Sequence, residues 1–438
     1  MTHFFALLLR IPRRTAAAAI AAALLSLGIW PAMADLVDAY FPPGIIGPDA
    51  KLGITVNSRE RPATDPLGVR VGAFTIRPQI GLASGYDSNP LFNRRAKGSP
   101  VIQTTGGVAV TSNSATEPLS GLFTVEDNRF TAVNRQSTTN WTASLGKVIA
   151  FGADKMTLTA AHLALHQTGR DLNTANLDRP GAYQINNIRL SYRADRGPFN
   201  VLPQVQYTGY RYDDVSISGV RSSQGYRNRD VLEGQLTVTY NYALLRDIAV
   251  VLRGASIQYE QGRPGIPPLG ATRPDATSVS ALAGIDHASS AVWRYRLLAG
   301  VQARQSASPA VKSRVAPIVE ANLIFMPSGL TTIGLTAARA VQDAAGEFAA
   351  AYTYTEARLA VDHELTRDIL LHGHLGVQRA EYEQGGAAET IANAATSVTW
   401  LANRNMRVIG SYNFTTKHSP TGGAISESVA MIRLQLGL

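Results

Sequence analysis

The sequence contains no cysteine among its 438 residues. This absence excludes a disulfide framework, thiolate metal sites and cysteine nucleophiles. Beyond residue 34 the chain also lacks any run of about 18 apolar residues, so membrane-spanning helices are not expected. The mean hydropathy of −0.03 would suit a soluble protein. It suits a transmembrane β-barrel equally well, because only every second residue of such a strand faces lipid.

Charged residues are also scarce, at 17% of the chain, and the formal net charge is +9. Arginine dominates the basic residues and is scattered singly, with no dense basic run. This distribution does not favour nucleic acid as a partner. It is more typical of arginines that line a barrel interior or a rim facing lipopolysaccharide.

Residues 1–34 have the three-part pattern of a secretory signal peptide. Arg10, Arg13 and Arg14 precede an apolar, alanine-rich run over residues 15–31, and Ala32-Met33-Ala34 forms a small-residue cleavage site. We therefore predict export, with the mature chain beginning at Asp35. The apolar run is short for a membrane anchor.

The last segment, residues 424–438, alternates strictly between apolar and mixed positions. Ile432, Leu434 and Leu436 share one face, whereas Arg433 and Gln435 share the other. Such a strand is expected where lipid lies outside and water inside. An open sheet edge is prohibitive in hydrocarbon, so this final strand is predicted to close a barrel against the first one.

From residue 71 onward, runs of strand-like sequence are joined by connections that are alternately long and short. Short turns are predicted near residues 152, 194, 244, 326, 365 and 402, and long connections near residues 93, 133, 175, 220, 268, 308, 347, 385 and 421. Nine long and eight short connections predict an all-β, antiparallel, up-and-down transmembrane barrel of about 18 strands over residues 71–438. Sixteen strands is the alternative count, and both termini are expected on the periplasmic side.

Residues 35–70 differ from the rest in being rich in proline and glycine, without sustained alternation. We interpret them as a periplasmic leader that folds into the barrel mouth and could plug it.

Because alternate residues of a strand point to opposite faces, odd and even positions can be assigned to the lipid or the lumen side in most strands. In the run from Val292, Trp293 and Leu297 are expected to face lipid, and Arg294 and Arg296 to face the lumen. Two runs, residues 155–167 and 247–259, change phase midway, which indicates either a β-bulge or a misassigned register. A soluble propeller or solenoid is the alternative fold, but no repeat of fixed period supports it.

Several motifs resemble the β-barrel porin 2 family of outer-membrane proteins. They are the leader block Val56 to Pro78, GYDSNPLF at residues 85–92, and YRNRD at residues 226–230. The leader of that family carries Arg-x-Arg-Pro and then Asp-Pro-Leu-Gly, which correspond here to Arg59, Arg61, Pro62, Asp65, Pro66, Leu67 and Gly68. The resemblance implies a large barrel often found beside capsular or exopolysaccharide functions, with no defined substrate.

Charged residues on the predicted inner faces are the candidate pore lining. Arginines that face carboxylates across a pore would pass polar solutes and reject apolar ones. The candidates are Arg77, Arg189, Arg193, Glu233, Arg294, Arg296, Arg304, Glu320, Glu356, Arg358, Asp362, His372, His374, Arg407 and Arg433. For most of them, bracing of the inner wall is an equally simple role.

Two histidine pairs have spacings at which they could be metal ligands. His372 and His374 are two residues apart and share a face with Gln378, but no third ligand is identifiable. His162 and His166 have a helical ligand spacing in a segment that reads as a strand. No metal, cofactor or catalytic residue is therefore expected, and no nucleophile elbow, P-loop or dinucleotide motif is present.

The sequence thus predicts a porin-like channel for polar solutes in the bacterial outer membrane. An exit conduit of a polysaccharide secretion system and a non-conducting scaffold barrel are the alternatives. Inward-facing Tyr183, Tyr210 and Tyr354 are compatible with the conduit. Expected partners are outer-membrane lipid, lipopolysaccharide, the barrel assembly machinery and, for the conduit, polysaccharide-export components.

Overall fold

The structure, a computed structural model, describes Tyr40 and residues 55–114, 116–172, 174, 177–260, 273–288, 292–309, 311, 313–343, 351–382, 388–420 and 422–438. The predicted signal peptide and most of the predicted leader therefore lie outside the described residues. Within the described part of the chain, no helix is both long and apolar enough to cross a membrane.

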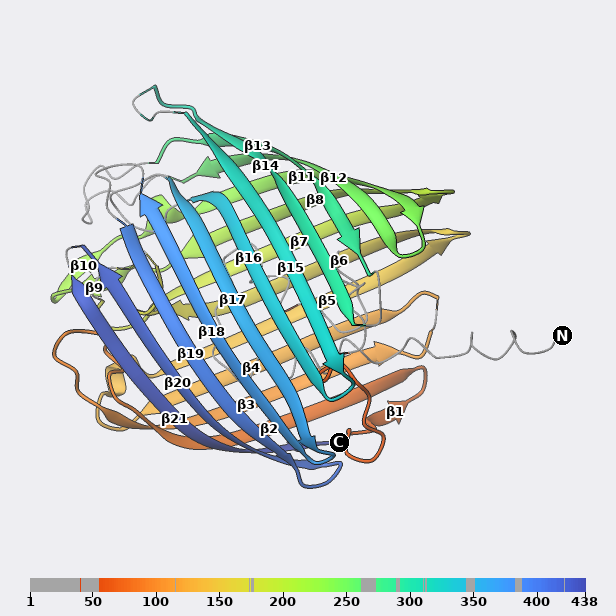
Figure 1. The fold of residues 1–438 in the computed structure, drawn as a ribbon. Helices are drawn as coiled ribbons and strands as arrows, with labels where there is room; N and C mark the ends of the chain where they lie inside the picture. The colour runs from red at the N-terminus through yellow and green to blue at the C-terminus, as the bar shows by residue number, and fades with distance from the viewer. Residues whose placement is uncertain are drawn as a thin grey trace.

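Eighteen long antiparallel strands form one sheet that closes on itself (Figure 1). The first of them, β2, pairs with both β3 and the last strand, β21, so the sheet has no free edge. The strands are β2 (Phe74–Asp87), β3 (Ser99–Ser112), β4 (Leu119–Phe130), β5 (Thr138–Phe151), β6 (Asp154–Gln167), β7 (Gly181–Arg196), β8 (Phe199–Tyr212), β11 (Arg229–Ala243), β12 (Arg246–Tyr259), β13 (Ala276–His287), β14 (Trp293–Ser306), β15 (Arg314–Ser328), β16 (Thr331–Asp343), β17 (Ala351–Thr366), β18 (Ile369–Tyr382), β19 (Ala388–Leu401), β20 (Met406–Ser419) and β21 (Gly423–Gly437).

Short elements decorate the barrel. The strand β1 (Val69–Val71) pairs with the start of β2, and β9 (Val215–Ile217) and β10 (Val220–Ser222) form a small hairpin between β8 and β11. Two 3-10 turns, η1 (Asn134–Gln136) and η2 (Gly225–Arg227), lie in connections.

The strand number and the order of connections confirm the prediction of 18 strands. Two ends of the barrel can be defined by these connections, the short-turn end and the long-loop end. The prediction fails for the connection near residue 421, because only residues 420–422 separate β20 from β21. Its length falls within the range at the opposite end, where two to six residues separate consecutive strands.

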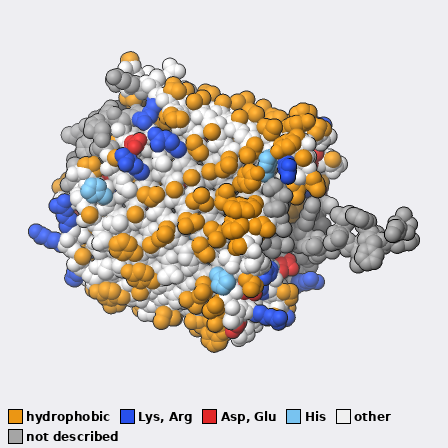
Figure 2. All heavy atoms as spheres, viewed as in Figure 1, with side chains coloured by type: hydrophobic (Ala, Val, Ile, Leu, Met, Phe, Trp, Pro, Cys, Tyr) orange, Lys and Arg blue, Asp and Glu red, His pale blue; other side chains and the backbone are white. Residues whose placement is uncertain are grey.

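The outer face is apolar, as parity predicted. Leu297, Val301, Ile432 and Leu434 are exposed on it, and Figure 2 shows hydrophobic side chains spread over the visible wall. Exposed aromatic side chains collect at its short-turn end, where an interfacial girdle is expected. They are Phe151, Phe199, Tyr240, Tyr242, Trp293 and Trp400.

Of the two explanations for the runs at 155–167 and 247–259, the β-bulge is wrong. β6 pairs with β5 and β7, and β12 pairs with β13, without a register shift. The alternation is lost because part of the inner face is itself apolar. Leu163 and Leu165 of β6 are buried against Ile185 and Tyr210 inside the barrel, and Val251 of β12 is buried in a second interior cluster.

The face assignment of β21 can be tested by placing a charge on either side. Ile432→Arg puts a guanidinium on the outer face, where Ile432 is 69% exposed, whereas Met431→Arg puts it on the inner face. In a bilayer the first substitution is expected to cost about 2–4 kcal/mol of unfolding free energy and the second much less. Denaturant unfolding in vesicles measures both; equal costs would contradict the assignment.

Candidate functional site: the barrel interior

The barrel interior is the candidate site because charged and polar side chains gather there. Alternation along each strand puts all the predicted pore-lining residues on the inner face, opposite the exposed apolar residues. Whether solutes pass them stays a prediction. The inner-face residues are Arg77, Arg189, Arg193, Glu233, Arg294, Arg296, Arg304, Glu320, Glu356, Arg358, Asp362, His372, His374, Arg407 and Arg433.

Several of these residues form side-chain hydrogen bonds or ion pairs with partners that the alternation of the sequence did not predict. Arg304 donates to Asp343 Oδ1 at 2.6 Å, and Arg253 pairs with Glu320 two strands beyond its neighbour. Arg433 donates to the Gln103 side chain. The inner wall is thus braced by charge-assisted hydrogen bonds, which are stronger than neutral ones.

The two inward histidines are held within the wall. His372 Nδ1 lies 2.5 Å from Asp362 Oδ1, and His374 Nε2 lies 3.1 Å from the Asn393 side-chain amide. Among the described residues no group of three or more His, Asp or Glu side chains could hold a metal ion.

A leader latch, formed by residues 55–66, lies inside the short-turn end of the barrel. Arg61 Nη2 donates to Glu364 Oε2 of β17 at 2.9 Å and to the Val56 carbonyl at 2.8 Å. Asp65 accepts from Arg407 of β20 at 3.0 Å. These bonds across the mouth hold the leader to strands on one side of the barrel.

The Asp-Pro-Leu-Gly motif supplies the turn by which the leader leaves the mouth. Gly68 has φ +77, a left-handed conformation that glycine adopts without strain. A Cβ at this position would also lie 2.8 Å from Arg77 and 2.9 Å from the Ile76 carbonyl. Asp65 and Gly68 of this motif therefore have structural roles in fixing the leader.

Tyr40 shows that a second part of the predicted leader lies deep in the lumen. Its carbonyl accepts a hydrogen bond of 2.5 Å from Ser144 on the inner face of β5, and its side chain packs against the interior cluster around Tyr183 and Tyr212. Burial raises the pKa of the Tyr40 phenol to about 12, with a further contribution from the Glu126 carboxylate.

A loop latch, formed by Arg170 and Asp171 of the connection between β6 and β7, lies at the long-loop end. Arg170 donates to both oxygens of Glu427 on β21, at 2.6 and 2.5 Å, and to Asp87 on β2 at 2.8 Å. Lys417 of β20 donates to the Asp171 carbonyl at 2.7 Å. Since β6 lies four strands from β2, this loop reaches across the interior.

Beside the loop latch lies an arginine–tyrosine cluster, consisting of Arg227, Arg229, Tyr210, Tyr212 and Tyr226. The Arg227 guanidinium stands 3.9 Å from the Tyr212 ring centroid, and that of Arg229 4.0 Å from the Tyr210 centroid. All five side chains are buried. Burial lowers the pKa of Arg227, and the nearby Arg273 and Arg229 guanidinium groups lower it further.

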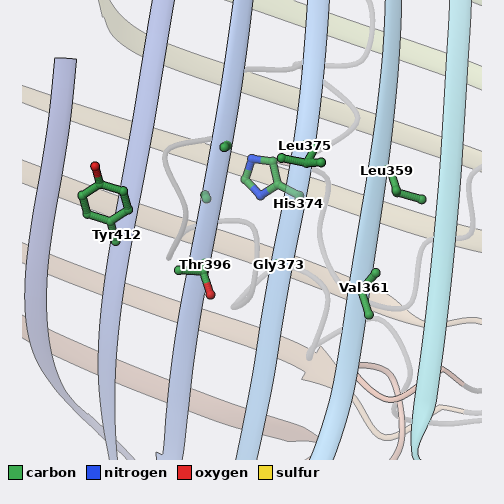
Figure 3. A pocket seen from close by; sticks show the side chains of 9 residues that line it. Leu359, Val361, Gly373, His374, Leu375, Thr396 and Tyr412 are labelled. Carbon is green, nitrogen blue, oxygen red and sulfur yellow. The ribbon is translucent and has the colours of Figure 1, made fainter. Parts of the chain in front are cut away.

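One hollow lies on the outer face rather than in the lumen (Figure 3). It is a shallow groove of about 300 Å³ over β17–β20, with Gly373 at its floor and Leu359, Val361, Leu375 and Tyr412 around it. We call it the outer groove. Its lining is almost entirely apolar.

Sequence reasoning missed most of the latch partners. Glu364, Arg170, Asp87 and Arg229 were not among the candidates. Strand parity could have found Glu364 and Asp87. Nothing in the sequence could have shown that Arg170, a loop residue, reaches across the barrel.

A closed barrel with an apolar outside and a charged inside is the architecture of an outer-membrane porin-type protein. The family model described as "Putative beta-barrel porin 2" matches residues 61–437. The chain therefore belongs to this family, and the resemblance seen in the leader motifs is confirmed.

Solved structures share the general fold at low similarity. The outer-membrane protein OpdK from Pseudomonas aeruginosa is 10% identical, with 83% of this chain and 99% of that chain covered and a TM-score of 0.43. OpdL from the same organism is 10% identical, with 84% and 100% covered and a TM-score of 0.41. No curated protein sequence matches the chain.

Arg61→Ala tests the leader latch. The variant removes the side chain that joins Glu364 to Val56, and each such charge-assisted bond contributes about 1.5–3 kcal/mol. Amide hydrogen exchange over residues 55–65 is expected to accelerate about tenfold or more. Arg70→Ala, at an exposed position on β1, is the matched control; equal exchange in the two variants would show that the latch is not held by Arg61.

Arg170→Ala tests the loop latch. It leaves the buried carboxylates of Asp87 and Glu427 facing each other without their cation, a loss expected to cost about 3–5 kcal/mol. Adding Asp87→Asn and Glu427→Gln should recover much of this cost, because the uncompensated charges disappear. Denaturant unfolding measures all three proteins, and failure of the added substitutions to rescue would contradict the charge argument.

Proposed function

We propose that this protein is a porin-like channel for polar solutes in the bacterial outer membrane, with the short-turn end in the periplasm. The observation that carries the proposal is the contrast between the two faces of a closed wall, apolar outside and charged inside. Barrels of 16–18 strands are wide enough to leave an aqueous channel. The orientation follows from the general rule that periplasmic turns are short and extracellular loops are longer.

In this proposal the channel is regulated by its own chain. The leader latch narrows the periplasmic mouth, Tyr40 fills part of the lumen, and the loop latch crosses the opposite end. Because each latch is held by ion pairs to the wall, a change of ionic conditions or a bound partner can release it without disturbing the sheet.

The arginine–tyrosine cluster supports a preference for anions in the channel. Rings of charged side chains set the selectivity of a pore, and here several buried guanidinium groups lie together at the extracellular end. A solute with carboxylate or phosphate groups would be attracted to this region, whereas a small cation would be repelled.

A second candidate function is the exit conduit of a polysaccharide secretion system. Inner-face tyrosines are more numerous than the sequence suggested. The ring centroids of Tyr183 and Tyr212 are 5.5 Å apart in a stacked pair, and those of Tyr352 and Tyr382 are 5.7 Å apart. Aromatic rings can act as platforms for sugar rings. The arginines beside them favour an acidic polysaccharide.

Deletion of residues 36–68 tests the channel directly. If the leader occludes the lumen, the deleted protein will show larger single-channel conductance in a planar bilayer than the chain that begins at Asp35. Unchanged conductance in a folded deletion variant would refute occlusion by the leader. A silent bilayer with both folded proteins would favour the non-conducting scaffold.

The two transport functions are separated by a salt gradient and by sugars. An open anion-preferring porin gives a reversal potential of anion sign, little affected by added neutral or acidic oligosaccharides. Block by acidic oligosaccharides, and not by neutral ones, would favour the conduit. Block by neither, with a reversal potential of cation sign, would contradict the role given to the arginine–tyrosine cluster.

A further inference from the structure

The wall of the barrel is incomplete between β15 and β16. Their ladder ends at the pair Val319 and Arg339, although β15 begins at Arg314 and β16 continues to Asp343. Each strand keeps its other neighbour to the end, since Arg314 pairs with Arg304 of β14 and Asp343 with Ala351 of β17. The two strands therefore separate at the long-loop end (Figure 1). We call this part of the wall, residues 314–318 of β15 and 340–343 of β16, the seam.

A proline explains why the ladder stops. If the register continued, Pro317 would lie opposite Val341, and proline has no backbone N–H to donate. The N–H and carbonyl of Val341 are instead satisfied by the side-chain amide of Gln302 on β14. Gln302 Oε1 accepts from Val341 N at 2.8 Å, and Gln302 Nε2 donates to Val341 O at 3.1 Å.

A second contact holds the end of β16 over the lumen. Arg304 of β14 donates to Asp343 Oδ1 from Nε at 3.1 Å and from Nη2 at 2.6 Å. Gln302 and Arg304 thus form a clasp that reaches past β15 to β16. Asp343 acts as the built-in anion on a guanidinium that is only 4% exposed.

The seam is lined by apolar groups and backed by charge. Ala316, Val341 and Ala351 form its buried apolar lining, and Val315 is 73% exposed on the outer face beside it. On the lumen side Asp343 also interacts electrostatically with Arg229, so the arginine–tyrosine cluster lies behind the clasp.

We propose that the seam is a lateral opening between the lumen and the surrounding membrane, and that its ligand is an amphiphile with an anionic head group and an acyl chain. The head group replaces Asp343 on Arg304, and the end of β16 moves free once the two Gln302 bonds to Val341 also open. The acyl chain then lies between Ala316 and Val341. No backbone–backbone hydrogen bond between β15 and β16 has to break, because their ladder already ends at Val319 and Arg339. This proposal rests on the barrel being embedded in a membrane, as proposed above.

Photolabelling tests the opening in the chain beginning at Asp35, folded in phosphatidylcholine vesicles. The probe is palmitic acid carrying a diazirine on its chain, and the neutral comparator is the corresponding alcohol. Palmitate is expected to label inner-face residues near Arg304 and Tyr352 about tenfold more than the alcohol does, as a charge-assisted bond implies. Both probes should label Leu359 in the outer groove, on the same strand as Tyr352.

The outer groove separates failure of this inference from failure of the proposed function. Labelling of Leu359 without labelling of the inner face would overturn the lateral opening and leave the membrane barrel intact. Absence of label at Leu359 as well would contradict the membrane placement itself.

Two variants make the route specific. Asp343→Asn removes the competing carboxylate, so inner-face labelling by palmitate should rise; unchanged or reduced labelling contradicts the exchange at Arg304. Ala316→Cys with Val341→Cys introduces the only two thiols of the chain across the seam. Once they are oxidised, inner-face labelling should disappear and return on reduction, whereas persistent labelling of the disulfide-locked protein would show entry from the open ends.

Discussion

The rest of this structure depends on one constraint, the requirement that every backbone N–H and carbonyl in hydrocarbon be hydrogen-bonded within the protein. The chain meets it by pairing β2 with β21, so the sheet has no edge. Closure then divides all side chains into two sets by parity, an apolar set outside and a more polar set inside. The latches, the arginine–tyrosine cluster and the seam all follow from what the chain does with the enclosed volume.

The chain fills much of that volume with its own segments. At one end the leader is bound to Glu364 and Arg407, and at the other Arg170 is bound to Asp87 and Glu427. Charged side chains that project inward from strands thus meet opposite charges carried by the leader and by a connecting loop. Ion pairs of this kind fix position well and can be exchanged for a competing ligand.

The seam is the exception to complete pairing, and it shows how a barrel tolerates one. Pro317 removes a donor, and Gln302 replaces the lost ladder bonds of Val341 with side-chain bonds. Both backbone groups of Val341 are therefore hydrogen-bonded although the sheet is interrupted there. A lateral route between lumen and membrane is the functional use that this arrangement permits.

Strand number, connection order and facing could be predicted because period-two alternation and turn chemistry are local properties of the sequence. The prediction of facing failed where the interior is apolar, as at Leu163 and Val251. Both faces of the strand then carry apolar residues, so the alternation cannot distinguish them. It also failed for contacts across the lumen, such as that of Arg170 with Glu427, which depend on the path of a loop. The leader motifs identified the family, but their bonding to Glu364 and Arg407 required the structure.

Thiol accessibility of two neighbouring residues tests the central claim, a closed wall with lipid outside and water inside. Because the chain has no cysteine, Arg296→Cys and Leu297→Cys each carry a single thiol on opposite faces of β14. In vesicles, a charged, water-soluble thiol reagent should modify the Arg296 variant and spare the Leu297 variant, and a lipid-soluble maleimide should show the opposite preference. Equal modification of both variants, or the reversed pattern, would contradict the account.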